Sequence, residues 1–129
     1  MRIQLVGDCP TAKVIRGYLR RHDFHLTDYH PDWIVHVEET EGLDTPALDG
    51  TGGALESIIL RHLRKQTASA IEIRTARTVS SEREVRVIVP SREPERKAVE
   101  TSVFRALLEL AAQGPSPSRW WTTMLQRKN

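Results

Sequence analysis

Residues 2–37 read RIQLVGDCPTAKVIRGYLRRHDFHLTDYHPDWIVHV. The apolar run that ends at Gly7 predicts a buried strand, and Pro10 opens a helix with apolar side chains at helical spacing. The segment WIVHV, residues 33–37, is rich in β-forming residues and predicts a second strand. Because the helix lies between the two strands, this stretch predicts a right-handed parallel βαβ unit.

The segment between this helix and WIVHV limits the topology. Residues 24–27 alternate between apolar and polar side chains, which predicts a brief strand. Only a few residues separate it from residues 33–37, whereas a parallel crossover needs about a dozen or more. We therefore expect residues 24–27 to form a short edge strand.

The rest of the chain predicts two more helices and a pair of strands. The fold class predicted is α/β: one small mixed sheet with a parallel βαβ start and an antiparallel C-terminal hairpin, flanked by about three helices. Residues 1–113 would form one domain, and residues 114–129 a linker and tail. The elements predicted after residue 38 are an extended piece at 47–48, a helix over 55–65, hairpin strands at 70–75 and 85–89, and a helix from Pro94 to Gly114.

Composition narrows the function classes. The 129 residues carry 19 basic and 17 acidic side chains, a net charge of +2, which is far from the dense basic face of a dedicated nucleic-acid binder. Nucleic acid stays a weakly supported partner. Cys9 is the single cysteine, so no internal disulfide forms, and a reducing compartment fits. No signal peptide or membrane span is recognisable. We therefore expect a cytoplasmic protein without membrane contact.

The first strand-to-helix turn, GDCPTA at residues 7–12, resembles a degenerate form of the dinucleotide-binding fingerprint of Rossmann-like nucleotide-binding domains. The resemblance covers residues 2–38. Cys9 stands where a second glycine would let the backbone approach a pyrophosphate. Asp28 lies 20 residues after Asp8, near where such folds place a ribose-binding acid. The resemblance implies a nucleotide as ligand or cofactor, held by Gly7, Asp8, Cys9, Thr11 and Asp28.

A second glycine-containing turn, DGTGG at residues 49–53, precedes a predicted helix. Successive backbone N–H groups at such a turn can bind an anion. The turn lacks the Lys-Ser/Thr of a P-loop, which leaves triphosphate binding unsupported. Alternatively, its residues only cap the helix and make the turn. The residues of this second candidate phosphate-binding loop are Asp49, Gly50, Thr51, Gly52 and Gly53.

These two turns carry the leading functional hypothesis, in which a nucleotide or another phosphorylated ligand binds a small sensor or accessory subunit. A different hypothesis is an enzyme, a Mg²⁺-dependent phosphohydrolase or nuclease. Asp8, Glu38 and Asp49 each follow a strand or extended segment, and ligands of open α/β sheets lie beyond the carboxyl ends of strands. Three carboxylates there would suit Mg²⁺. The competing interpretation is that all three are solvated loop acids.

The C-terminal tail predicts an interaction. It carries Trp120, Trp121 and Met124 after a linker, and two such tryptophans are rarely left in water. Either the tail folds back over the sheet, or it binds a protein partner or a second copy of the chain. The interaction hypothesis is therefore a non-enzymatic module that forms a homodimer.

Residues 22–36 contain four of the five histidines, which raises the question of a zinc site. Zinc needs three or four side chains that converge at about 2 Å. The predicted elements scatter these histidines over a helix end, an edge strand, a turn and a central strand. We therefore predict no metal site. What remains is His36, two residues before Glu38 on the same face of one strand.

Overall fold

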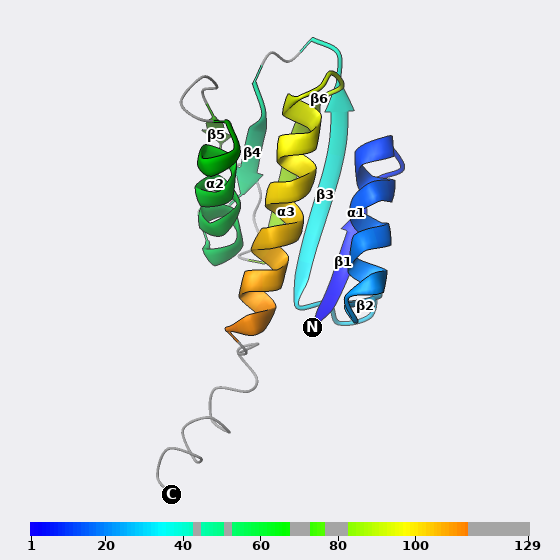
Figure 1. The fold of residues 1–129 in the computed structure, drawn as a ribbon. Helices are drawn as coiled ribbons and strands as arrows, with labels where there is room; N and C mark the ends of the chain where they lie inside the picture. The colour runs from blue at the N-terminus through cyan, green and yellow to red at the C-terminus, as the bar shows by residue number, and fades with distance from the viewer. Residues whose placement is uncertain (43–44, 51–52, 68–72, 77–82, 114–129) are drawn as a thin grey trace, which may run out of the picture.

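The computed structural model describes residues 1–42, 45–50, 53–67, 73–76 and 83–113. These residues form one mixed sheet of six strands in the order β2-β1-β3-β6-β4-β5, together with three helices (Figure 1). The predicted α/β class is confirmed. The elements are β1 (Arg2–Val6), α1 (Pro10–Arg21), β2 (His25–Leu26), β3 (Trp33–Thr40), β4 (Ala47–Gly50), α2 (Ala54–Thr67), β5 (Arg74–Ala76), β6 (Glu84–Pro90) and α3 (Glu95–Ala112).

The first half of the chain folds as the βαβ unit that its sequence predicts. Strands β1 and β3 are parallel neighbours, and α1 connects them. Strand β2 is a two-residue edge strand on the other side of β1, parallel to it. Thr27 N donates to the Ile3 carbonyl on the β2 side, and Asp32 N donates to the Arg2 carbonyl on the β3 side. The short loop after β2 therefore passes from one side of β1 to the other.

The C-terminal half differs from the prediction in one pairing. Strand β6 is parallel to β3 and antiparallel to β4, and β5 pairs with β4. Strands β5 and β6 run in opposite directions, as predicted, but β4 lies between them, so they do not form a direct hairpin. The physical reason is Leu48, which is completely buried and makes residues 47–50 an internal strand. Residues 70–72 of the predicted strand lie outside the described residues.

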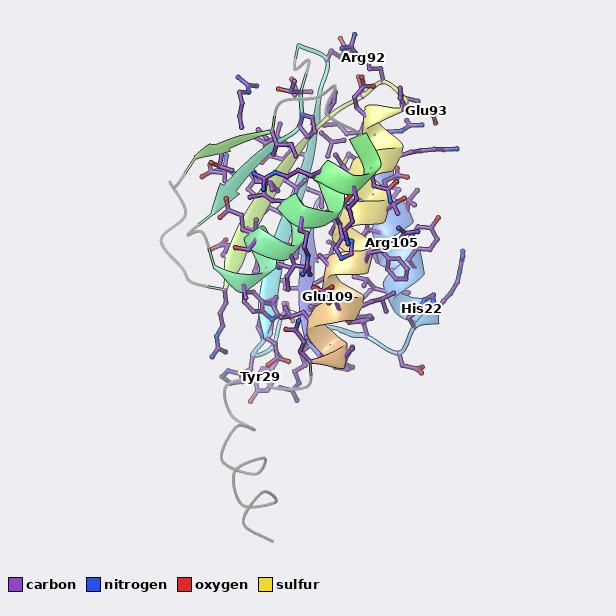
Figure 2. All side chains as sticks on the ribbon, turned by 60° about the vertical axis from the view of Figure 1, so that its left-hand side comes forward. His22, Tyr29, Arg92, Glu93, Arg105 and Glu109 are labelled. Atoms are coloured by element: carbon purple, nitrogen blue, oxygen red, sulfur yellow. The ribbon has the colours of Figure 1, made fainter. Side chains whose placement is uncertain are left out.

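The three helices of the described residues cover the same face of the sheet. Helix α3 lies in the middle and packs against α1 and α2 on either side (Figures 1 and 2). Doubly wound nucleotide-binding folds carry helices on both faces, so the sheet described here differs from theirs in its layers. The buried side chains between the two layers include Ile3, Val35, Val37, Val85, Val87 and Val89 from the strands and Ile15, Leu19, Ile59, Leu63, Val103 and Leu107 from the helices.

No described helix covers the other face of the sheet, which we call the open face. Polar side chains of neighbouring strands contact one another on it: His36 Nε2 contacts the Glu84 carboxylate, and Arg86 Nη2 forms an ion pair with Asp49 Oδ2 at 3.4 Å. His36 and Glu38 lie on the same face of β3, and His36 also contacts Glu84 on the neighbouring strand. No described helix is both long and apolar enough to cross a bilayer. By alternation along the strands, the open face carries Gln4, Val6, Ile34, His36, Glu38, Ala47, Asp49, Glu84, Arg86 and Ile88.

Candidate functional site

The turn between β1 and α1 packs directly against the backbone of β3. Gly7 has φ +142°, a value that side chains rarely allow, and a Cβ there would overlap the Val37 carbonyl oxygen. Cys9 Sγ donates a hydrogen bond to the same carbonyl, at 3.6 Å. The glycine and the cysteine of this turn therefore both have a role in packing.

A carboxylate of the chain itself occupies the N-terminus of α1. The Thr11 backbone N–H and the Thr11 hydroxyl both donate to Glu39 Oε1, at 3.2 and 2.7 Å. An acidic group is favoured there because the first N–H groups of a helix lack partners and carry partial positive charge. Glu39 thus holds the position that the sequence assigns to a ligand phosphate, so a phosphate bound at Thr11 would have to displace it.

Glu39 belongs to a polar cluster at the start of α3. Glu100 Oε1 lies 3.9 Å from Arg96 Nε, and the Glu100 side chain is 12% exposed. Arg96 Nη2 donates a hydrogen bond to Glu93 at 2.7 Å. Burial raises the pKa of Glu100, and the charges of Glu39 and Glu93 raise it further. The charge of Arg96 and a hydrogen bond with the Thr11 hydroxyl lower the same pKa. The cluster joins the end of β3 to the starts of α1 and α3. In the sequence, this cluster is indicated by the acidic residues Glu38, Glu39 and Glu41, which follow the segment WIVHV.

The second glycine-containing turn lies elsewhere. Because β4 is antiparallel to β6 and β3, its Asp49–Gly50 end points away from the end of β3 (Figure 1). Two strands separate β4 from β1, which amounts to about 14 Å at about 4.8 Å per strand. The structure therefore does not bring Asp49 and Gly50 together with Gly7. Thr51 and Gly52 lie outside the described residues, and Gly53 accepts a hydrogen bond from Ser57 N at the start of α2.

The three carboxylates considered for Mg²⁺ are also spread over the sheet. Asp8 follows β1, Glu38 is on β3, and Asp49 pairs with Arg86 two strands away from Glu38. Within the described ranges, no three His, Cys, Asp or Glu side chains lie close enough together to hold a metal ion. The arrangement gives no support to a shared Mg²⁺ ion.

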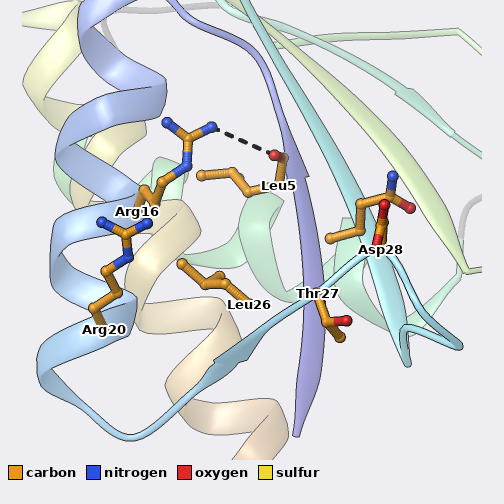
Figure 3. A pocket seen from close by; sticks show the side chains of 7 residues that line it. Leu5, Arg16, Arg20, Leu26, Thr27 and Asp28 are labelled. Atoms are coloured by element: carbon orange, nitrogen blue, oxygen red, sulfur yellow. Dashed lines mark hydrogen bonds between the residues drawn. The ribbon is translucent and has the colours of Figure 1, made fainter.

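Asp28 lines a separate cleft at the edge of the sheet. This edge cleft has a volume of about 240 Å³ and lies between β1, α1 and the loop after β2 (Figure 3). Leu5 and Leu26 form its apolar wall next to α1. Gln4, Thr27 and Asp28 bring polar groups, and Arg16 and Arg20 of α1 bring positive charge.

The edge cleft exists because β2 is so short. Strand β2 pairs with β1 only at Arg2 and Ile3, and Tyr29 N then donates to the Thr27 hydroxyl oxygen as the chain turns away. The carbonyls of Met1 and Ile3 face β2, since they accept from His25 N and Thr27 N. By the alternation of a parallel ladder, the backbone groups of Leu5 face the same side, where no described strand continues.

Arg16 partly covers this free backbone edge. Its Nη2 donates to the Gly7 carbonyl at 2.9 Å and reaches the Leu5 carbonyl at 3.5 Å. Within the part of the chain that the structure describes, neither Arg16 nor Arg20 forms an ion pair, and neither does Asp28. The edge cleft thus offers two uncompensated guanidinium groups on one wall and a carboxylate on the other.

The sequence analysis named Asp28, which lines the edge cleft, but it did not name Arg16 and Arg20, which line the same cleft. Their spacing of four residues puts them on one helix face, and this was the available signal. Its meaning depends on where β2 ends, which the local sequence does not specify. The predicted interaction residues Trp120, Trp121 and Met124 lie outside the described residues.

Comparisons with known proteins bear on the fold. The sequence matches no family model, and no curated protein matches it. Among solved structures, N-acetylmuramoyl-L-alanine amidase AmiC2 of Nostoc punctiforme is similar, with a TM-score of 0.60 and 10% sequence identity over 87% of this chain and 97% of that one. This likeness shows the fold alone.

Proposed function

We propose that this chain is a small accessory binding module that holds an anionic ligand, carrying a phosphate or carboxylate group, in the edge cleft. The observation that supports the proposal is the pair Arg16 and Arg20, which face one cleft and have no acidic partner in the described part of the chain. The sequence predicts a phosphorylated ligand at the β1–α1 turn. In this proposal the ligand lies instead in the edge cleft, next to β1 and α1.

The chemistry of the cleft walls specifies the ligand further. Guanidinium groups donate strong, charge-assisted hydrogen bonds to phosphate or carboxylate oxygens. Arg16 is oriented by the Gly7 carbonyl, and its other N–H groups are available to a ligand. Across the cleft, Asp28 and Thr27 can accept hydrogen bonds from hydroxyl or amino groups. We therefore expect a ligand with an anionic group at one end and hydrogen-bond donors at the other, as in a nucleotide.

Binding without catalysis fits the described residues better than hydrolysis. The similar solved structure is that of an amidase, but at 10% sequence identity the similarity in fold gives no reason to assign amidase activity to this chain. The sequence alternative of a Mg²⁺-dependent hydrolase needs converging carboxylates, which the described part of the chain does not assemble. The single cysteine keeps the cytoplasm as the expected compartment.

The test is a ligand panel read by thermal unfolding and by NMR titration. Inorganic phosphate, acetate and adenosine monophosphate should raise the melting temperature of the wild type and shift the signals of residues 16–28. Arg20→Gln should abolish both effects, whereas Lys13→Gln, an exposed position on the same helix, should keep them. No response to any of these anions at millimolar concentration would refute the proposal.

A second candidate function is a protein-interaction module or homodimer. The observation that favours it is the open face, where Val6 is 38% exposed and the partly exposed Ile34 and Ile88 lie among the ion pairs. Sedimentation equilibrium of the full chain and of Ile88→Lys would test it. A dimeric wild type and a monomeric variant would support it, and a monomeric wild type would exclude the homodimer.

A further inference from the structure

We infer that the edge cleft takes the C-terminal carboxylate of an extended peptide, which adds as a short strand to the free edge of β1. This inference rests on the proposed function, because it uses the same cleft, and it names the class of ligand. The occupant is a peptide segment of a partner protein, with its last residue between β1 and α1.

The first support is the free backbone edge. From Gln4 onward, no described strand pairs with β1 on the side of β2. The N–H and C=O of Leu5 point to that side by the alternation of the ladder. Unpaired edge groups of this kind are a template for another strand. A free phosphate would satisfy the arginines but would leave this edge without a partner strand.

The second support is the order of charge along the cleft. Arg16 lies level with Leu5, whose carbonyl it reaches, and Arg20 lies one helical turn further along α1, near Leu26 (Figure 3). Because β2 closes the Ile3 end, a peptide must enter from the Gly7 side, and a peptide that enters with its C-terminus first runs antiparallel to β1. Its carboxylate then ends near Arg20 and accepts a hydrogen bond from the Leu5 N–H.

The third support is the match of side chains on the two walls. Successive side chains of a strand point to opposite faces of the sheet. The last peptide residue, opposite Leu5, would point toward α1 and contact Leu26, so we expect it to be apolar. The residue before it would point to Thr27 and Asp28, so we expect it to be basic or to carry a hydroxyl group.

The experiment compares three synthetic peptides with the sequence Gly-Thr-Val-Lys-Leu by titration calorimetry with the full chain. The first has a free C-terminal carboxylate, the second a C-terminal amide, and the third a free carboxylate with the last peptide nitrogen methylated. We expect the first to bind, and the second and third to bind at least about tenfold more weakly, because hydrogen bonds to charged or edge groups are lost.

Variants and hydrogen exchange supply the controls. Arg20→Gln should lower the affinity for the first peptide at least about tenfold, and Lys13→Gln should leave this affinity unchanged. The Leu5 amide should exchange more slowly when the peptide is bound. Arg20 is the better position to change, because Arg16 also holds the Gly7 carbonyl and its removal affects folding.

The outcomes separate the inference from the proposed function. If the three peptides bind equally, or if acetate and phosphate bind as tightly as the first peptide, the inference fails and anion binding stands. If no peptide and no small anion binds, both are overturned. Tight binding of the first peptide, lost in Arg20→Gln and on methylation, supports both.

Discussion

The Glu39 carboxylate accepts hydrogen bonds from both the backbone N–H and the hydroxyl of Thr11, at 3.2 and 2.7 Å. An acid from the end of β3 thus neutralises the first turn of α1, where a nucleotide-binding protein would hold a phosphate. The N-terminus of α1 is therefore occupied by a carboxylate of the chain itself.

The first prediction concerns this contact. Glu39→Gln should lower the free energy of unfolding by about 1 kcal/mol, because a charge-assisted cap becomes a neutral one. Urea unfolding at neutral pH measures it. The matched control is Glu38→Gln, next in sequence but exposed, which should change the stability by less than about 0.5 kcal/mol. Equal losses in the two variants would contradict the capping role of Glu39.

The second prediction is a pH dependence from Glu100. Its pKa lies above the ordinary value of 4.5, chiefly because of burial, so its ionised form is disfavoured in the folded protein. The associated stability is complete below pH 4.5 and is lost as the pH rises through the folded pKa. Glu100→Gln should therefore gain stability over the wild type at pH 7 but not at pH 4. A gain of equal size at both pH values would argue against it.

The third prediction concerns His62, which lies between α2 and α3. Burial lowers its pKa from 6.5, and Arg61, Lys65 and Arg105 lower it further. The resulting stability is present above pH 6.5 and is lost as the pH falls through the folded pKa. We expect His62→Gln to flatten the stability profile below pH 6.5, as measured by thermal unfolding in a series of buffers.

His62 lies close to an acidic residue of α3. Its Nε2 lies 3.6 Å from Glu109 Oε1, whose partner oxygen contacts Arg61, and Glu109 is labelled on α3 in Figure 2. His25→Gln, an exposed change on β2, should leave the profile unchanged. A variant profile that still falls as steeply as that of the wild type would rule out His62 as its source.

The fourth prediction compares two glycines. Gly7→Ala should destabilise the protein by at least about 2 kcal/mol, since φ is positive and the new Cβ meets the Val37 carbonyl. Gly17→Ala should stabilise it by up to about 1 kcal/mol, because a Cβ within α1 would meet only Arg21, at 4.0 Å. Chemical unfolding of both variants gives the comparison. Similar effects of the same sign would show that local backbone conformation does not explain Gly7.

The fold could be predicted where local periodicity decides it. The β1–α1–β3 unit follows from the apolar run before Gly7, the helical spacing after Pro10 and the β-rich segment 33–37. The place of β4 could not be predicted, because it depends on pairing with β6, between Leu48 and Val87, across a long sequence separation. Local patterns give strands but not their neighbours.

In the candidate site, too, the sequence predicts local features but not those that depend on the folded sheet. Gly7 was predicted to contact a ligand, whereas the structure shows its close packing on the Val37 carbonyl, a contact that only the folded sheet reveals. Arg16 and Arg20 were not singled out, because on a bare sequence they are two of many basic helix residues. Their setting arises from the early end of β2, fixed by the turn at Thr27.

Strand β3, the longest among the described residues, pairs with β6 along seven register positions, from Ile34 with Glu84 to Thr40 with Pro90. During synthesis, β1, α1 and β3 leave the ribosome well before β6 exists, so a nascent chain carries β3 with one side unpaired. Such long-range pairing slows folding and leaves an early intermediate open to association with its neighbours. A chain that stops before Glu84 should therefore aggregate, even though it contains the whole βαβ unit.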